Sequence, residues 1–325
     1  MNELTTHIYS SNDTLPDGLM EENFFHSPQL FHLCRKTPRQ QPFMVTVETP
    51  DGEVVAQMLA VLRRRASWLP PYLYRQCRVV GEGVYRPDRP KDQLFDMMLQ
   101  ALKETIGRKS LFIEFSNLSQ KMFGYKQFRE QNYFPVSWQE VHQSLHGMAP
   151  EERLDEKALL QIRKSQEAGV ITRVLTQHDD PKPFYQLLRA YYRLKPRKFV
   201  PSLTFFEELL KSPEARLCLT EHNGKAIGCC VLVFSGGNAY LWFMAAKRMS
   251  QASLHPDTMT VWNAIQLARQ EGCRHIYFMD AGLPFRKSNY RDFILKFGGK
   301  PVAKYRWFRF SIKSLNKFLA WLYRE

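Results

Sequence analysis

Long apolar runs are absent from this sequence of 325 residues. No stretch of about 18 uncharged apolar residues occurs, so the sequence predicts no transmembrane helix. The first residues, MNELTTHIYSSNDTLPDG, lack the basic start and apolar centre of a signal peptide. We therefore expect a cytoplasmic protein, with the inner face of the membrane as an alternative location.

Motifs for metals, ATP and disulfides are also missing. The six cysteines form no C-x-x-C pair and lie mostly within apolar, strand-like runs, which is typical of buried free thiols. The nine histidines show no metal-ligand spacing with cysteines or carboxylates, and no P-loop occurs. These absences argue against a zinc site, a disulfide framework or an ATP-dependent enzyme.

Positive charge is present in excess and is unevenly distributed. Residues 1–150 contain 17 Lys and Arg against 16 Asp and Glu, whereas residues 151–325 contain 29 against 16. A basic surface that only keeps the protein soluble is one interpretation. The other is an anionic ligand or surface that binds the second half, such as coenzyme phosphates, tRNA or acidic lipid.

The two halves of the chain repeat one order of elements, although their residues hardly match. A β-hairpin turns at Pro50-Asp51-Gly52 in the first half and at Asn223-Gly224 in the second. In each half the hairpin is followed by a strand, a helix, a strand, a short helix and a last strand. The helices cover residues 92–107 and 256–271, and the short helices lie in YKQFREQNYF and YRDFILKF. This order predicts a duplicated domain.

Each half predicts an α/β fold in which a mixed sheet has helices on both faces. The polar segment PEERLDEKALLQIRKSQEAG between the halves predicts a helix that ends at Gly169. We place the domain boundary at residues 149 and 150. The predicted domains are residues 1–149 and residues 150–325.

The order of elements resembles the GNAT acyltransferase fold. Its tandem use is similar to the FemABX family, which makes peptidoglycan cross-bridges, and to the broader FemAB-like acyltransferases. The similar segments, in order along nearly the whole chain, are FFHSPQLFHLC, NLSQKMFGYKQFREQNYF, IRKSQEAGV and VWNAIQLARQEGCRHIYFMDAGLPFRKSNYRDFILKFGGKPV. The resemblance implies two tandem GNAT-like domains, no metal, and a donor that is an acyl-CoA such as acetyl-CoA or an aminoacyl-tRNA.

The chain differs from typical family members at several positions of the resemblance. Family members have a lysine after the first aromatic residue of the short helix, where this chain has Ile294. Tyrosines of the central strand are replaced by Phe243 and Ala245, and an expected carboxylate comes one place later, at Asp280. The resemblance then implies a FemAB-like transferase that acts on a substrate other than peptidoglycan, or one that has lost its activity.

The donor site is expected in the C-terminal domain. In the GNAT fold two central strands part, and the donor lies between them with its phosphates at the N-terminus of the next helix. Here the gap should separate NAYLWFMAAK from RHIYFMD. A polar loop that only leads into a helix is the alternative, because the glycine-rich loop of acetyl-CoA enzymes is absent. The candidate phosphate ligands in KRMSQASLHPD are Lys247, Arg248, Ser250 and Ser253.

Transfer of an acyl group to an amine needs one group that takes a proton and another that donates a hydrogen bond or proton. Asp280, at the end of a buried strand, is the candidate base, and Tyr290 is the candidate donor. A carboxylate that caps a turn and a core tyrosine are the alternatives. The candidate ligands for an anionic acceptor at the domain junction, or else residues of solvated helix faces, are Arg163, Lys164, Lys195, Arg197 and Lys198.

Lys296 lies beside the apolar stripe of the short helix, which is formed by Tyr290, Phe293, Ile294 and Phe297. Charged residues commonly flank such stripes. We expect the lysine stem to lie on apolar surface with its charge in solvent, and no role in the chemistry.

The segment SIKSLNKFLAWLYRE predicts an amphipathic helix. Docking of its apolar face on its own domain is the first interpretation. A peripheral membrane contact through residues 311–325 is the alternative, which suits a lipid-linked acceptor. The apolar face consists of Ile312, Leu315, Phe318, Leu319 and Leu322.

The leading hypothesis is an N-acyltransferase. It would transfer an acyl or aminoacyl group to an amine of an anionic small-molecule or lipid-linked acceptor. The alternative is a noncatalytic protein of the same fold that binds tRNA or an acidic surface through its basic second half.

Overall fold

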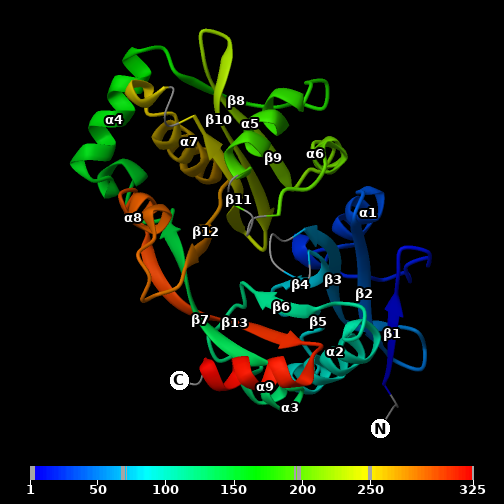
Figure 1. Ribbon diagram of the computed structural model, residues 1–325. Helices are drawn as coiled ribbons and strands as arrows, with labels where there is room; N and C mark the ends of the chain where they lie inside the picture. Colours follow the sequence, from blue (N-terminus) through cyan, green and yellow to red (C-terminus); the bar gives the residue numbers. More distant parts are fainter. Residues whose placement is uncertain are drawn as a thin grey trace. The chain divides into compact units, whose positions relative to one another are not determined.

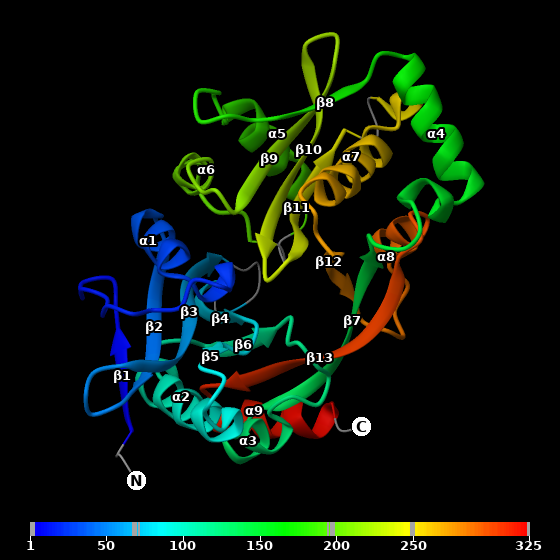
Figure 2. The same cartoon turned by 180° about the vertical axis from the view of Figure 1, so that it is seen from behind.

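The computed structural model describes residues 4–66, 70, 72–193, 195, 199–247 and 251–323. Contacts divide the chain into two compact units. Unit 1 consists of Met1–Trp138 and Ala303–Glu325, and unit 2 consists of Gln139–Val302. Figures 1 and 2 show the elements from opposite sides.

Unit 1 contains the first copy of the repeated order. Its sheet has the strand order β1-β2-β3-β4-β6-β13, with β5 paired to β3. The elements are β1 (Thr5–Tyr9), a 3-10 turn (Phe24–His26), α1 (Pro28–Lys36), β2 (Gln40–Glu48), β3 (Val54–Ala66), β4 (Leu73–Val80), β5 (Val84–Tyr85), α2 (Lys91–Ile106), β6 (Phe112–Ser116), α3 (Tyr125–Glu130), the start of β7 (Phe134–Ser144), most of β13 (Lys300–Phe310) and α9 (Lys313–Leu322).

The core of unit 1 lies between its sheet and the helices α2 and α3. Alternate residues of β2 and β3 face this core, because successive side chains of a strand point to opposite faces of the sheet. Helix α1 packs on β2 from the opposite side of the sheet (Figure 1). The largest fully buried side chains of the core are Phe43, Phe95, Phe115, Phe128, Tyr133 and Trp307.

Unit 2 contains the second copy. Its strand order is β7-β12-β11-β10-β9-β8. The elements are the end of β7, a 3-10 turn (Pro150–Arg153), α4 (Glu156–Glu167), β8 (Ile171–Val174), α5 (Lys182–Tyr192), α6 (Leu203–Leu209), β9 (Ala215–His222), β10 (Lys225–Ser235), β11 (Asn238–Ala246), a 3-10 turn (Ala252–Leu254), α7 (Pro256–Gln270), β12 (His275–Gly282) and α8 (Asn289–Leu295).

Helices cover both faces of the unit 2 sheet, as the sequence predicted. Two adjacent cysteines of β10 lie on opposite faces of this sheet, because successive side chains of a strand point to opposite sides. Cys230 belongs to the core on the α7 side, whereas the Cys229 thiol lies 3.8 Å from the Phe184 carbonyl oxygen of α5. All six cysteines are buried and free, which confirms the prediction made for them.

Local sequence signals explain where several elements begin. The two hairpins turn at Gly52 and at Asn223-Gly224, all with positive φ angles that glycine and asparagine adopt readily. Helix α8 begins after Ser288, whose hydroxyl accepts a hydrogen bond from the Arg291 N–H at 3.2 Å. The observed order of elements in the two copies confirms the duplicated order that the sequence predicted.

The last strand of each copy enters the sheet of the other unit. Strand β7 ends the first copy, but its residues from Gln139 onward pair with β12 in unit 2. Strand β13 ends the second copy and pairs with β6 in unit 1. The contacts thus divide the chain at two places, unlike the single predicted boundary at residue 149. Either copy offers a strand of similar pattern, so local sequence does not decide which sheet a last strand joins.

No helix in the part of the chain that the structure describes is long and apolar enough to cross a membrane. Helix α9 differs in orientation from the first of its two interpretations, docking of the whole apolar face on its own domain. Of the face expected to dock on the domain, Ile312, Phe318 and Leu322 are exposed, and the buried residue of the helix is Asn316.

Candidate active site in unit 2

Strands β11 and β12 part in the middle of the unit 2 sheet. Their parallel pairing consists of Ala239 with Ile276, Tyr240 with Tyr277 and Leu241 with Phe278. Beyond this point β11 stays paired to β10 as far as Ala246, while its other edge has left β12. The gap that the sequence predicted between these two strands is present.

A bulge in β12 lies at the mouth of this gap. Phe278 pairs with Val141 of β7, but the next pair joins Gly282 to Gln139, so β12 has extra residues between the two pairs. Asp280, in the bulge, has a φ of +67°. Aspartate adopts this left-handed conformation more readily than most residues, and bulges redirect side chains. The bulge therefore takes Asp280 out of the regular alternation of the strand.

A cavity of about 180 Å³ lies at the gap. Asp280 and Tyr290, the two predicted catalytic residues, both line it. The remaining lining comes from the end of α5, from β11 and from the residue before Asp280: Tyr191, Tyr192, Lys195, Leu241, Trp242, Met244 and Met279. The fold thus brings together side chains from four separate segments of the sequence.

The two most buried tyrosines of the cavity remain protonated at neutral pH. Burial raises the pKa of Tyr290 well above its ordinary value, and Tyr192 and Asp280 add to the rise. Burial, followed by Tyr191 and Asp280, also raises the pKa of Tyr192. The Tyr192 hydroxyl donates a hydrogen bond to the Met244 carbonyl oxygen at 3.0 Å.

Lys195 adds a positive charge to the same cavity. Its Nζ lies 3.5 Å from the centre of the Tyr191 ring, a cation–π contact that orients the side chain. The cavity therefore contains a carboxyl group, an ammonium group and three phenols. These are the types of group that acid–base catalysis of acyl transfer requires.

A second cavity, of about 230 Å³, lies at the N-terminus of α7. Lys157 and Gln161 of α4 line one side, and Phe293 and Lys296 line another. The rest of the lining is Ala252, His255, Pro256, Asp257 and Thr258. Two lysines and a helix N-terminus favour a negatively charged ligand, although Asp257 opposes it.

Helix α8 contributes residues to the lining of both cavities. Tyr290 lines the first and Phe293, one turn later, lines the second. Ile294 and Phe297 are fully buried in the core. Lys296, which the sequence predicted to be only a solvated charge, lines the second cavity.

Most of the predicted donor and acceptor ligands that the structure describes do not line either cavity. Lys247 and Ser253 are exposed and line neither cavity, although the neighbouring Ala252 and His255 line the second. Arg163 and Lys164 are exposed on α4, away from both linings. Lys195 alone lines the cavity with Asp280. The remaining predicted ligands, Arg248, Ser250, Arg197 and Lys198, lie outside the described residues.

Sequence reasoning missed Tyr191, Tyr192 and Lys157. The family resemblance placed tyrosines on the central strand, where this chain has Phe243 and Ala245. In the structure the phenols come instead from the last turn of α5. The pair Tyr191-Tyr192, close to a basic cluster, is the signal that could have indicated them.

The corresponding strands of unit 1 do not part. Strand β4 pairs with β6 from Gln76 with Phe112 to Val80 with Ser116, and the Gly81 N–H then donates to the Ser116 carbonyl oxygen at 2.7 Å. The ladder thus continues to the strand ends. A donor arm would find no free strand edge there.

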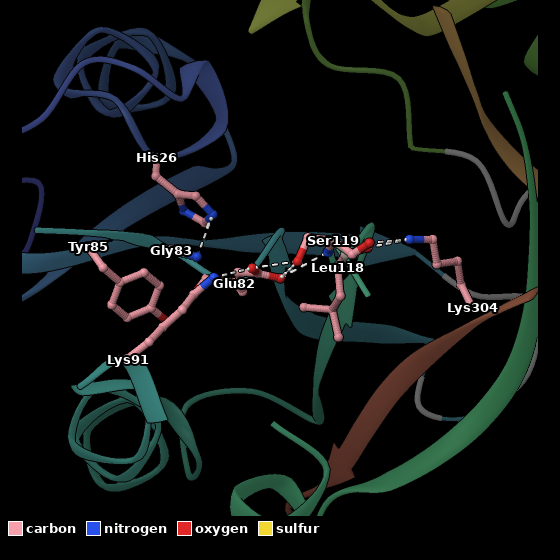
Figure 3. Close-up of polar contacts among 8 residues, drawn as sticks. All are labelled: His26, Glu82, Gly83, Tyr85, Lys91, Leu118, Ser119 and Lys304. Atoms are coloured by element: carbon pink, nitrogen blue, oxygen red, sulfur yellow. Dashed lines mark hydrogen bonds and ion pairs between the residues drawn. The ribbon is translucent and has the colours of Figure 1, made fainter. Parts of the chain in front are cut away.

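A network of protein groups fills the loop after β4 (Figure 3). The Glu82 carboxylate lies 2.6 Å from the Lys91 Nζ and accepts a hydrogen bond from the Ser119 N–H at 2.9 Å. Burial opposes ionisation of Glu82, but hydrogen bonds from Lys91 and Ser119 outweigh it and lower its pKa. A buried negative charge at this loop disfavours phosphate.

Comparisons with known proteins agree with this geometry. Residues 157–291 match the family model described as an acetyltransferase (GNAT) domain. This range includes every residue of the first cavity and all of the second except Phe293 and Lys296. A comparison with curated proteins finds no match.

Three solved structures share the fold over nearly the whole chain. FemX has a TM-score of 0.62 and 12% identity, covering 92% of this chain and 94% of its own. L-PGS from Bacillus licheniformis has a TM-score of 0.59 and 12% identity, covering 91% and 93%. A tandem GNAT protein from the clavulanic acid biosynthesis pathway has a TM-score of 0.55 and 12% identity, covering 95% and 99%.

The chain therefore has a tandem GNAT fold similar to that of FemX, and residues 157–291 of unit 2 match a GNAT acetyltransferase domain. The predicted fold class is confirmed. No group of three His, Cys, Asp or Glu side chains within the described residues is arranged to bind a metal.

Proposed function

We propose that unit 2 transfers an acyl group from an acyl-CoA to an amine, with the donor arm in the gap between β11 and β12. The observation that supports this proposal best is the parting of these strands with a cavity of acid–base groups at their ends. An aminoacyl-tRNA is the alternative donor, because its 3′ end also presents an activated carbonyl next to phosphates.

The second cavity suits the donor phosphates. Lys157 and Lys296 would supply positive charge, and the N-terminus of α7 would add its partial positive charge. Helix α8 lies against both cavities, so a donor with phosphates in one could place its acyl group at the other.

Asp280 and Tyr290 then have complementary roles. The amine nitrogen forms a bond to the acyl carbon, and the bond from that carbon to the donor sulfur breaks. Asp280 takes the proton that the amine loses, while Tyr290 gives its hydroxyl proton to the leaving sulfur. Transfer of the proton from Asp280 back to Tyr290 completes the cycle.

Tyr192 and Lys195 bind and orient rather than react in this scheme. The Tyr192 hydroxyl donates to the Met244 carbonyl oxygen of β11. Lys195, with its charge at the cavity, suits a negatively charged group on the acceptor. The acceptor is then an amine on an anionic molecule, of small size or attached to lipid.

A transfer assay with two donors tests the proposal. Purified protein is incubated with radiolabelled acetyl-CoA or with charged tRNA and a panel of amines, and donor binding is followed by calorimetry. We expect Tyr290→Phe to lower kcat about 100-fold while the donor Kd changes less than about threefold. Tyr185→Phe, on α5 but outside both cavities, is the matched control and should retain activity.

The outcome also separates the alternatives. Transfer from charged tRNA but not from acetyl-CoA would support the proposed site and show that the donor is an aminoacyl-tRNA. Binding of tRNA without transfer by any preparation, or a Tyr290→Phe variant with normal kcat, would contradict the proposed chemistry.

A further inference from the structure

A polar residue anchors helix α9 to unit 1. The Asn316 side-chain oxygen accepts a hydrogen bond from the Phe310 N–H at 2.7 Å, and its nitrogen donates to the Asn132 carbonyl oxygen at 3.0 Å. Asn316 is the buried residue of α9. Two satisfied hydrogen bonds to the backbone therefore hold this side of the helix against β13 and the turn before β7.

Three large apolar side chains of α9 consequently face away from the domain, while Leu315 and Leu319 are half-buried. Phe318 is 55% exposed, Trp321 is 62% exposed and Leu322 is 54% exposed. Ile312, just before the helix, is 51% exposed, and the rings of Phe318 and Trp321 lie 6.1 Å apart. Single exposed apolar residues need no explanation, but a row of large ones on a single helix marks an interaction surface.

Basic residues lie beside this apolar surface. Lys313 and Lys317 are exposed on α9, and no Asp or Glu occurs between Asp292 and Glu325. The Ser311 N–H, just before α9, donates to the Leu111 carbonyl oxygen at 2.9 Å, next to the exposed Arg108 and Lys109. Aromatic and aliphatic side chains within a basic rim are the pattern of helices that lie on anionic membranes.

A second copy of the chain fits this surface less well. A two-fold contact would place the α9 lysines of both copies close together, with no carboxylate between residues 293 and 323 to compensate. An anionic lipid surface supplies the negative charge and the apolar layer together.

We propose that α9 binds the surface of a membrane that contains anionic lipid. Phe318, Trp321 and Leu322 enter the boundary between headgroups and acyl chains, and Lys313 and Lys317 contact lipid phosphates. The helix lies parallel to the surface, because Asn316 holds its opposite side on the protein. This inference rests on unit 1 and does not depend on the acyltransferase chemistry proposed for unit 2.

Vesicle flotation with the full chain tests the proposal. One set of vesicles is phosphatidylcholine alone, and the other also contains phosphatidylglycerol. We expect binding to the second set, and the double variant Phe318→Ala with Trp321→Ala should weaken it at least about tenfold. The matched control, Tyr72→Ala with Met122→Ala, removes two other large exposed side chains of unit 1 and should bind normally.

Charge reversal separates electrostatic attraction from insertion. Lys313→Glu with Lys317→Glu should abolish the preference for phosphatidylglycerol, whereas Lys182→Glu with Lys225→Glu, the same charge change in unit 2, should not. Circular dichroism confirms that each variant is folded. Equal binding by all variants, no binding by the natural chain, or a dimer in sedimentation that dissociates on the Phe318 and Trp321 changes would overturn the proposal.

Discussion

The pairs β4 with β6 and β11 with β12 occupy the same place in the two copies, yet only one pair parts. In unit 2 the parallel ladder stops at Leu241 and Phe278, and a cavity with Asp280 and two protonated tyrosines lies beyond it. In unit 1 the ladder runs to Val80 and Ser116, and Glu82 lies in the loop that follows. The same fold thus has parted strands beside a cavity in one copy and a closed strand pair in the other.

Polar networks explain how the closed copy is stabilised. The Gly83 N–H and the Leu59 N–H both point at ring nitrogens of the buried His26, at 3.0 Å each. A neutral imidazole has a single acceptor nitrogen, so it accepts one of these hydrogen bonds at a time. Lys304 donates to the carbonyl oxygens of Leu118 and Ser119, which fastens the loop on the other side of Glu82 (Figure 3).

The largest expected effect contrasts the two carboxylates at these strand pairs. Asp280→Asn removes the proposed base, so kcat should fall between about 10²-fold and 10⁴-fold, with little change in donor binding. Glu82→Gln in unit 1 should leave kcat unchanged. Steady-state kinetics on both folded variants checks the contrast, and equal losses would show that unit 1 takes part in the reaction.

Acid should weaken unit 1 through His26. Burial lowers the pKa of His26 from 6.5 to about 4. The folded state therefore binds this proton less well than the unfolded state. The resulting stability is complete above pH 6.5 and is lost as the pH falls toward 4, by about 2 kcal/mol at pH 5 and about 3 kcal/mol below pH 4.

Urea unfolding at pH 7 and pH 5 measures this loss. His26→Gln should reduce the difference between the two pH values, whereas His178→Gln, an exposed residue of unit 2, should leave it as in the natural chain. A pH dependence that survives in His26→Gln would assign the acid sensitivity to other groups.

The smallest effect concerns the donor phosphates. Lys157→Ala with Lys296→Ala should raise the donor Kd about tenfold, because each lysine is partly solvated and contributes modestly. Lys91→Ala, whose lysine pairs with Glu82 in unit 1, should leave the Kd unchanged. Calorimetry on Lys247→Ala tests one of the four phosphate ligands that the sequence predicted. A larger increase in donor Kd for this variant would place the phosphates at the loop before α7.

Sequence reasoning succeeded where the signal was local. Hairpin turns, helix starts and alternating apolar residues lie within a few positions of each other, so the duplicated order of elements could be predicted and then compared with the GNAT fold. The same patterns placed Asp280 at the end of a strand and Tyr290 at the start of α8. Their proximity follows from the fold once its family is recognised.

Other features could not be predicted because they depend on distant segments. The phenol of Tyr192 reaches the cavity from α5, and Lys157 meets Lys296 at the N-terminus of α7 from a different helix. The apolar stripe of α9 was predicted correctly but its direction was left open, and in the structure Ile312, Phe318 and Leu322 of that stripe are exposed. Two hydrogen bonds of the Asn316 side chain fix that direction, and the spacing of apolar residues does not predict them.

By itself the sequence determined the order of strands and helices, the repetition of that order, the burial of the cysteines and the excess of positive charge. Each of these follows from composition or from neighbours along the chain. Only the tertiary structure decided that β11 and β12 part while β4 and β6 stay paired, that β7 and β13 join opposite units, and which side chains share a cavity. The physical reason is that strand pairing and cavity linings are set by the packing of segments far apart in the sequence, where several arrangements satisfy the same local pattern.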